Sequence, residues 1–332
     1  MSAVPGESAP GKYTPKGSVS APISLGRQDY ISVLLRLVGM ELYKLRRRVM
    51  SKVLSIIALL SVVLVFLLIA LVVALFLGSA QSQLAVRSAS EPLRLPLSLY
   101  VVAQVILPLG QVLIIILAGA IVGGEYAVGT IRLMFTRGPG RIQFLLAKVI
   151  ALVSCIVLSV VGMTVLGILL GSLLNLITGV APNFVFITGA WLGHALLYML
   201  ITMLALFMYA MMAFWFATLG RVTAAGMAGA LVWNFLAEPV LKFVFGVLAS
   251  VTGGAMAHLW GAVPDYFISN NISTLLQNQG TSLFGLVLPG QVLTSGSAYP
   301  LSDLHALLVL VGYLILFIGL SWWITVRRDV TN

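Results

Sequence analysis

VLSIIALLSVVLVFLLIALVVALFL, residues 53–77, is an apolar run without a charged side chain. A helix needs about 20 such residues to cross the roughly 30 Å hydrocarbon core of a bilayer, so this run predicts a transmembrane helix. Apolar residues make up 60% of the 332-residue chain, charged residues make up 8%, and the mean hydropathy is +1.10. This composition excludes an ordinary soluble domain. We therefore expect an all-α, polytopic membrane protein.

Further apolar runs follow on the C-terminal side. The six predicted spans cover residues 53–77, 97–122, 144–174, 186–219, a segment starting at 222, and 304–326. Together they predict a transmembrane domain over residues 51–326. Residues 1–28 are rich in Ser, Pro, Gly and Lys and lack the apolar core of a signal peptide, so we expect a disordered cytoplasmic tail there. Residues 327–332 are predicted to form a short C-terminal tail.

Residues 29–50 predict an amphipathic helix before the first span. Its apolar residues recur at three- and four-residue spacing and predict one face: Ile31, Leu34, Leu35, Val38, Leu42, Leu45 and Val49. Charged residues are expected opposite them: Arg36, Glu41, Lys44 and Arg47. The interfacial basic cluster comprises Lys44, Arg46, Arg47 and Arg48. This pattern favours a helix lying in the headgroup plane; the alternative is a solvated helix docked on a soluble partner.

The positive charges predict the orientation of the chain. Nine of the 19 basic residues precede residue 53, and the long segment after the fifth span has none. Under the positive-inside rule, both termini are expected in the cytoplasm, with the chain in the plasma membrane. The basic residues expected inside are Arg46, Arg47, Arg48, Arg132, Arg137, Arg141, Lys148, Arg221, Arg327 and Arg328, whereas Arg87 and Arg94 are expected outside. The net charge of +10 does not indicate nucleic acid, because no basic stripe is interleaved with aromatic residues.

A basic block separates the second and third spans. It reads GEYAVGTIRLMFTRGPGRIQFLLAK, residues 124–148, with Glu125 where an apolar run ends and a Gly-Pro-Gly turn between Arg137 and Arg141. Its amphipathic stretches are short. We therefore expect residues 123–148 to form a structured cytoplasmic loop that a soluble partner binds.

The sequence contains no recognisable catalytic motif. HExxH, GxSxG and GxxxxGK[ST] are absent, and His194, His258 and His305 are widely separated. Cys155 lies alone in an apolar run and is expected to be a packing residue. We expect no catalytic or metal site and no cofactor bound by this chain, so any use of ATP requires another protein.

The fifth span contains the sequence Glu238-Pro239, followed by Lys242. Glu238 and Lys242 are four residues apart and are expected to pair on one helix face, about 24 Å along the span. Pro239 predicts a kink or break. These three residues are a possible outer gate, although a purely structural pair is the alternative. Residues 239–303 are expected outside, with short surface helices and a possible re-entrant segment at 240–251.

The chain resembles the permease subunit of a type-2 ABC exporter over residues 28–332. Three features carry the resemblance: the helix ending in MELYKLRRR (residues 40–48), the basic block at 124–148, and six spans with a long external segment before the last. The resemblance implies that the loop docks on a separate ATPase subunit, which binds ATP and Mg²⁺. The coupling positions it implies are Glu125, Gly129, Thr130, Arg132, Arg137, Arg141 and Lys148.

The resemblance also implies a second permease chain, most simply in a homodimer, and a pathway lined by spans one, two and five and by the outer re-entrant piece. Membrane lipid is the other expected partner. Of the coupling positions, Glu125 and Arg132 are expected to hold the fold of the loop. Arg137 and Arg141 are expected to meet acidic groups of the ATPase. The chain shows no fused ATPase and no large external domain, which puts subtypes with such additions in doubt.

Two other functions stay open at this point. A carrier driven by an ion gradient normally needs buried carboxylates near the midplane, which this sequence lacks, although backbone carbonyls can also bind sodium. A membrane-embedded enzyme acting on lipid would require one of the three histidines. The transported substrate is left open among drugs, peptides, lipids and sodium.

Overall fold

The computed structural model describes residues 30–78, 92, 95–128, 140–177, 187–284 and 301–327. Its long helices are α1 (Tyr30–Arg47), α2 (Val49–Gly78), α4 (Leu97–Val128), α6 (Arg141–Ile177), α7 (Gly189–Gly220) and α12 (Asp303–Arg327). The segment between α7 and α12 contains α8 (Thr223–Val232), the π-helical turn η2 (Trp233–Ala237), α9 (Glu238–Val251), α10 (Gly254–Ala262), the 3₁₀ turn η3 (Val263–Tyr266) and α11 (Ile268–Phe284). Within the described residues the chain is helical.

Six helices of the described part are long and apolar enough to cross a membrane. They are α2, α4, α6, α7, the continuous stretch from α8 to α9, and α12. These are the six predicted spans, with ends that differ from the predicted ones by a few residues. Segments that cross a bilayer are helical because the hydrocarbon core offers no hydrogen-bond partner to unpaired backbone N–H and C=O groups. The fold is that of an all-α, multi-pass membrane protein with an N-terminal helix before the first span.

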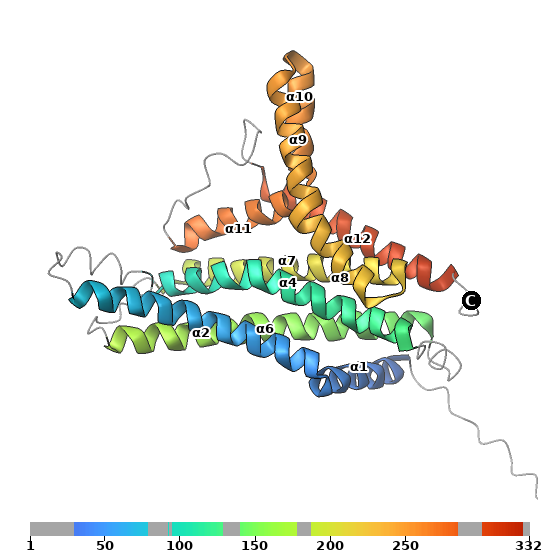
Figure 1. The fold of residues 1–332 in the computed structure, drawn as a ribbon, viewed down its shortest axis with the longest axis horizontal. Helices are drawn as coiled ribbons and strands as arrows, with labels where there is room; N and C mark the ends of the chain where they lie inside the picture. The colour runs from blue at the N-terminus through green and yellow to red at the C-terminus, as the bar shows by residue number, and fades with distance from the viewer. Residues whose placement is uncertain are drawn as a thin grey trace, which may run out of the picture.

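The long helices lie side by side, and α7 is at their centre (Figure 1). It contacts α4, α6, α8, α11 and α12, and its buried side chains include Met208, Met211 and Met212. By contrast, α2 exposes a series of large apolar side chains, including Leu60 and Leu75. Apolar residues all around a helix, exposed on its outer face, are typical of contact with lipid.

The described basic residues gather at one end of this bundle. That end, the α1 end, is where α1 lies, α4 ends, α6 begins and α12 ends (Figure 1). Every described Lys and Arg except Lys242 belongs to an element or a helix terminus at the α1 end. This is the charge asymmetry that the positive-inside pattern predicts.

Glycines permit the close approach of α4 and α8. A Cβ on Gly123 would lie 2.3 Å from the backbone nitrogen of Thr223, and one on Gly119 would lie 3.1 Å from that of Met227. Small residues four apart on α4 therefore mark a close helix contact here. The pair Gly189 and Gly193 does not: an added Cβ would meet nothing within 4 Å at either residue.

Where a kink or break was predicted at Pro239, the helix is continuous but contains a π-helical turn just before the proline. Residues Trp233–Ala237 have π-helical geometry, and Pro239 lies in the first turn of α9. Proline has no amide hydrogen and clashes with the preceding turn, and an extra residue in that turn relieves both problems. The segment at 240–251 continues as α9 and turns back into α10, so that the two form a hairpin standing away from the long helices (Figure 1).

One predicted boundary needs correction. The loop predicted at 123–148 is helical at both of its ends, because α4 extends to Val128 and α6 starts at Arg141. The region at 239–303 contains α9, α10 and α11, so the expected short helices are present. The tail at 1–28, Arg87, Arg94 and residues 328–332 lie outside the described residues.

The predicted faces of the amphipathic helix also need correction. The side of α1 that packs on the protein carries Leu37, Glu41 and Leu45, all buried, so Glu41 is not on a solvated back. Two residues of the predicted apolar face, Ile31 and Leu35, are exposed. The helix thus has a protein-facing side and a separate exposed apolar side; its placement in the headgroup plane stays a prediction.

Candidate functional site

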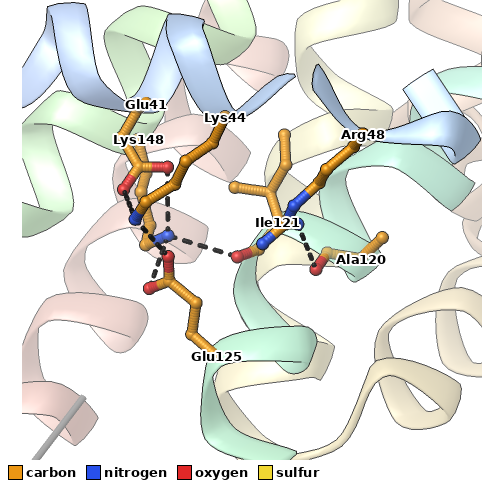
Figure 2. Close-up of polar contacts among 7 residues, drawn as sticks. All are labelled: Glu41, Lys44, Arg48, Ala120, Ile121, Glu125 and Lys148. Atoms are coloured by element: carbon orange, nitrogen blue, oxygen red, sulfur yellow. Dashed lines mark hydrogen bonds and ion pairs between the residues drawn. The ribbon is translucent and has the colours of Figure 1, made fainter. Parts of the chain in front are cut away.

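Four charged side chains meet at the α1 end. Glu41 and Lys44 come from α1, Glu125 from the last turn of α4, and Lys148 from the second turn of α6 (Figure 2). Three separate helices therefore supply the cluster, which we call the charge ring. Two of these helices, α4 and α6, flank residues 129–140 of the basic block, which we call the basic loop.

The ring alternates in sign. Lys44 Nζ lies 2.9 Å from Glu41 Oε1 and 3.0 Å from Glu125 Oε1. Lys148 Nζ lies 2.8 Å from Glu125 Oε2 and 3.5 Å from Glu41 Oε2. Each charge thus contacts two charges of opposite sign, and the four sum to zero. A closed arrangement of this kind can be buried because no member is left uncompensated.

Burial makes the ring energetically important. The side chains of Glu41 and Lys148 are 3% exposed, that of Glu125 is 6% exposed and that of Lys44 is 28% exposed. Burial would lower the pKa of the Lys44 ammonium, but the hydrogen bond to Glu41 and the charges of Glu125 and Glu41 outweigh it and raise that pKa. Lys44 is therefore charged at neutral pH.

Hydrogen bonds to the α4 backbone extend the ring. Lys148 Nζ donates to the carbonyl of Ile121 at 3.2 Å, and Arg48 Nη1 donates to the carbonyl of Ala120 at 3.3 Å (Figure 2). At the other end of α1, Gln143 Nε2 donates to the carbonyl of Tyr30 at 3.4 Å. Both ends of α1 are consequently bonded to the helices that flank the loop, so that a displacement of those helices would also move α1.

The sequence prediction treated several of these residues differently. Glu125 and Lys148 are two of the predicted coupling positions, and Glu125 was expected to hold the fold of the loop; both side chains are buried and connect helices. Within the predicted interfacial basic cluster, Lys44 and Arg48 bond inside the protein. Arg46 and Arg47 are exposed, and Arg47 lies over the Tyr43 ring at 5.4 Å.

The remaining coupling positions fall around the loop. Arg141 is the first residue of α6. Gly129, Thr130, Arg132 and Arg137 lie outside the described residues, so their predicted roles stay predictions. Sequence reasoning missed Glu41. The available signal was its position four residues from both Leu37 and Leu45, which places it on their helix face.

Glu238 and Lys242 form the predicted pair. Lys242 Nζ lies 3.4 Å from Glu238 Oε1 and bonds to the hydroxyl of Ser269. The backbone nitrogen of Ser269 donates to Glu238 Oε1 at 2.9 Å. Glu238 is 1% exposed. The pair ties the start of α9 to the start of α11; its role as a gate with Pro239 stays a prediction.

His194 and His305 have separate partners. His194 Nδ1 contacts Gln279 Oε1 at 2.8 Å, and His305 packs edge-on against Tyr266. In the part of the chain that the structure describes, no three His, Cys, Asp or Glu side chains are placed to hold a metal ion.

Comparison with known proteins does not identify a family for this chain. No protein-family model and no curated protein matches this chain. The architecture alone defines the class as a multi-pass helical membrane protein.

Proposed function

We propose that the chain is the permease subunit of an ATP-driven exporter in the plasma membrane, with both termini in the cytoplasm. A separate ATPase subunit, binding ATP and Mg²⁺, would dock on the basic loop. A second permease chain, most simply another copy, would complete the pathway. The chain itself would carry no ATPase site, in keeping with the missing phosphate-loop sequence.

One observation carries this proposal: the charge ring bonds an interfacial helix to the two helices that flank the basic loop. A force applied to the loop acts first on the end of α4 and the start of α6. Since Glu125 and Lys148 lie in those turns, the ring would pass the displacement to α1. A mechanical link of this kind between the basic loop and α1 supports the proposal.

Co-purification of ATPase activity tests the proposal. A tagged full-length chain, expressed in its own host and purified from membranes in mild detergent, should bring vanadate-sensitive ATP hydrolysis with it. The change Arg137→Glu with Arg141→Glu should reduce the retained activity at least about tenfold, because charge complementarity holds such interfaces. Arg36→Glu with Arg47→Glu is the matched control, since it changes the net charge equally on exposed side chains of α1.

The control should retain its ATPase activity. Equal retention by the loop variant and the control would contradict docking through the loop. Transport of cargo by the chain alone in liposomes would contradict the proposal as a whole.

A carrier driven by an ion gradient is the second candidate, and buried Glu238 is the observation that favours it. Buried carboxylates in membrane helices mark ion and proton pathways in many carriers. Transport in ATPase-free liposomes that follows an imposed proton or sodium gradient and is lost in Glu238→Gln would support this function over the first.

A further inference from the structure

A second feature of the α1 end is a cavity separate from the charge ring. It has a volume of about 630 Å³ and lies among α1, α2, α4 and α6, reaching Leu206 of α7. Pockets of several hundred cubic ångströms are the size that holds small organic ligands. This cavity does not include any residue of the charge ring.

The depth of the cavity matches the thickness of the hydrocarbon part of one leaflet. Along α4 its wall runs from Leu117 to Ile106. At 1.5 Å per residue this is about 16 Å, close to half of a roughly 30 Å hydrocarbon core. Along α6 the wall runs from Cys155 to Met163. The cavity therefore extends from the interface at the α1 end to about the middle of the bundle.

The walls are apolar and the rim is open. Ile56 of α2 and Leu158 of α6, which line the cavity, are 60% and 75% exposed. The cavity thus opens sideways between these two helices, on the surface that would face lipid. Water is a poor occupant because apolar walls offer it few hydrogen-bond partners.

Two cations lie at the interfacial end. Arg46, in the last turn of α1, and Lys52, in the first turn of α2, both line the cavity. Among the described residues, no carboxylate pairs with either of them, whereas Lys44 and Arg48 beside them are already bonded. An apolar cavity of leaflet depth with two cations at its interfacial end, neither paired with a carboxylate of the described residues, is complementary in charge and shape to an anionic lipid.

We propose that this cavity is a binding site for an anionic phospholipid from the leaflet at the α1 end. One acyl chain lies between α2 and α6, and the phosphate-bearing headgroup contacts Arg46 and Lys52. Basic pockets between membrane helices bind anionic headgroups by this charge attraction. The site holds a resident lipid and does not depend on the proposed transport function.

Native mass spectrometry of the purified full-length protein tests the site. The detergent-exchanged protein is titrated with phosphatidylglycerol and with phosphatidylcholine of the same acyl chains. Two basic side chains near a membrane surface predict roughly thirtyfold tighter binding of the anionic lipid. The double variant Arg46→Gln, Lys52→Gln should reduce that preference to near unity. The matched control Arg36→Gln, Arg47→Gln removes two exposed charges of the same helix region that do not line the cavity, and should keep the preference.

A steric pair of variants tests the slot independently of charge. Ser159→Trp places an indole in the cavity and should abolish retention of the tight lipid, whereas Val157→Trp, on the same helix but outside the cavity wall, should leave it. A diazirine on the acyl chain should crosslink to peptides of α2 or α6. Any one of four outcomes would overturn the proposal. They are equal binding of the two lipids, equal loss of the preference in both charge variants, crosslinks confined to other helices, and a cavity that holds no lipid and is covered by a second copy of the chain.

Discussion

Glu125 Oε2, in the last turn of α4, and Lys148 Nζ, near the start of α6, lie 2.8 Å apart. The contact joins the last turn of α4 to the early part of α6 at one buried point. Glu41 and Lys44 of α1 complete that point. Four predictions follow from the packing of these and other named residues.

Removing one member of the ring should destabilise the protein strongly. Lys148→Met leaves two buried carboxylates with one cation, and loss of one partner from a buried pair costs about 3–5 kcal/mol. Thermal unfolding of the purified protein in detergent, followed by intrinsic fluorescence, measures the effect. Arg47→Met, at an exposed site, is the control and should change the midpoint little. A midpoint for Lys148→Met equal to that of the control would show that the ring is not a stabilising contact.

A double variant should recover part of this loss. Glu125→Gln with Lys148→Met removes one charge of each sign and leaves the Glu41–Lys44 pair, whose atoms are 2.9 Å apart, intact and neutral. Its destabilisation should be smaller than the sum of the two single effects by roughly 0.5–3 kcal/mol, the range for residues in contact. Strict additivity in the same unfolding experiment would mean that the two side chains do not interact.

The contribution of Lys44 should depend on pH only under alkaline conditions. Its pKa is raised in the folded protein, so its stabilising effect is complete below the unfolded pKa of 10.5 and is lost as pH rises through the folded pKa. The difference in unfolding midpoint between the wild type and Lys44→Met should therefore be constant from pH 7 to about 9 and shrink above about 10.5. A difference that falls between pH 7 and 9 would be incompatible with this pKa direction.

The contact between α4 and α8 should not tolerate a side chain. Gly123→Ala would place a methyl group 2.3 Å from the backbone nitrogen of Thr223, and the helices must then separate, at a cost of about 1–3 kcal/mol or more. Gly193→Ala is the matched control, because nothing lies within 4 Å of its added Cβ. The control should be neutral or slightly stabilising, since alanine favours a helix by roughly 0.5–1 kcal/mol. Similar unfolding midpoints for both variants would contradict the close approach.

Much of the fold was predictable from short-range pattern. Each span is a run of apolar residues longer than a bilayer requires, and Pro239 indicated a kink or break where the helix is continuous but contains a π-helical turn. The i, i+4 pair of Glu238 and Lys242 was also predictable, since helix geometry alone brings such residues together.

The charge ring was harder to predict from the sequence. Glu125 and Lys148 were found because they bracket a basic block, but their burial was not evident, and Glu41 was assigned to the wrong side of its helix. A carboxylate on an amphipathic helix is ordinarily solvated. Glu41 is buried because Lys148, from a helix far along the chain, supplies the opposite charge. No local pattern contains that information.

The amino-acid sequence by itself determined the class of protein, the number of membrane-crossing helices and the end at which the cations gather. The physical reason is that crossing a bilayer is a local matter of length, hydrophobicity and flanking charge. The tertiary structure alone decided which charges are buried, which helices α1 contacts through its charged side chains, and where a cavity of lipid size is left. These depend on contacts between residues distant in the chain, whose stabilisation exists only once the helices have packed.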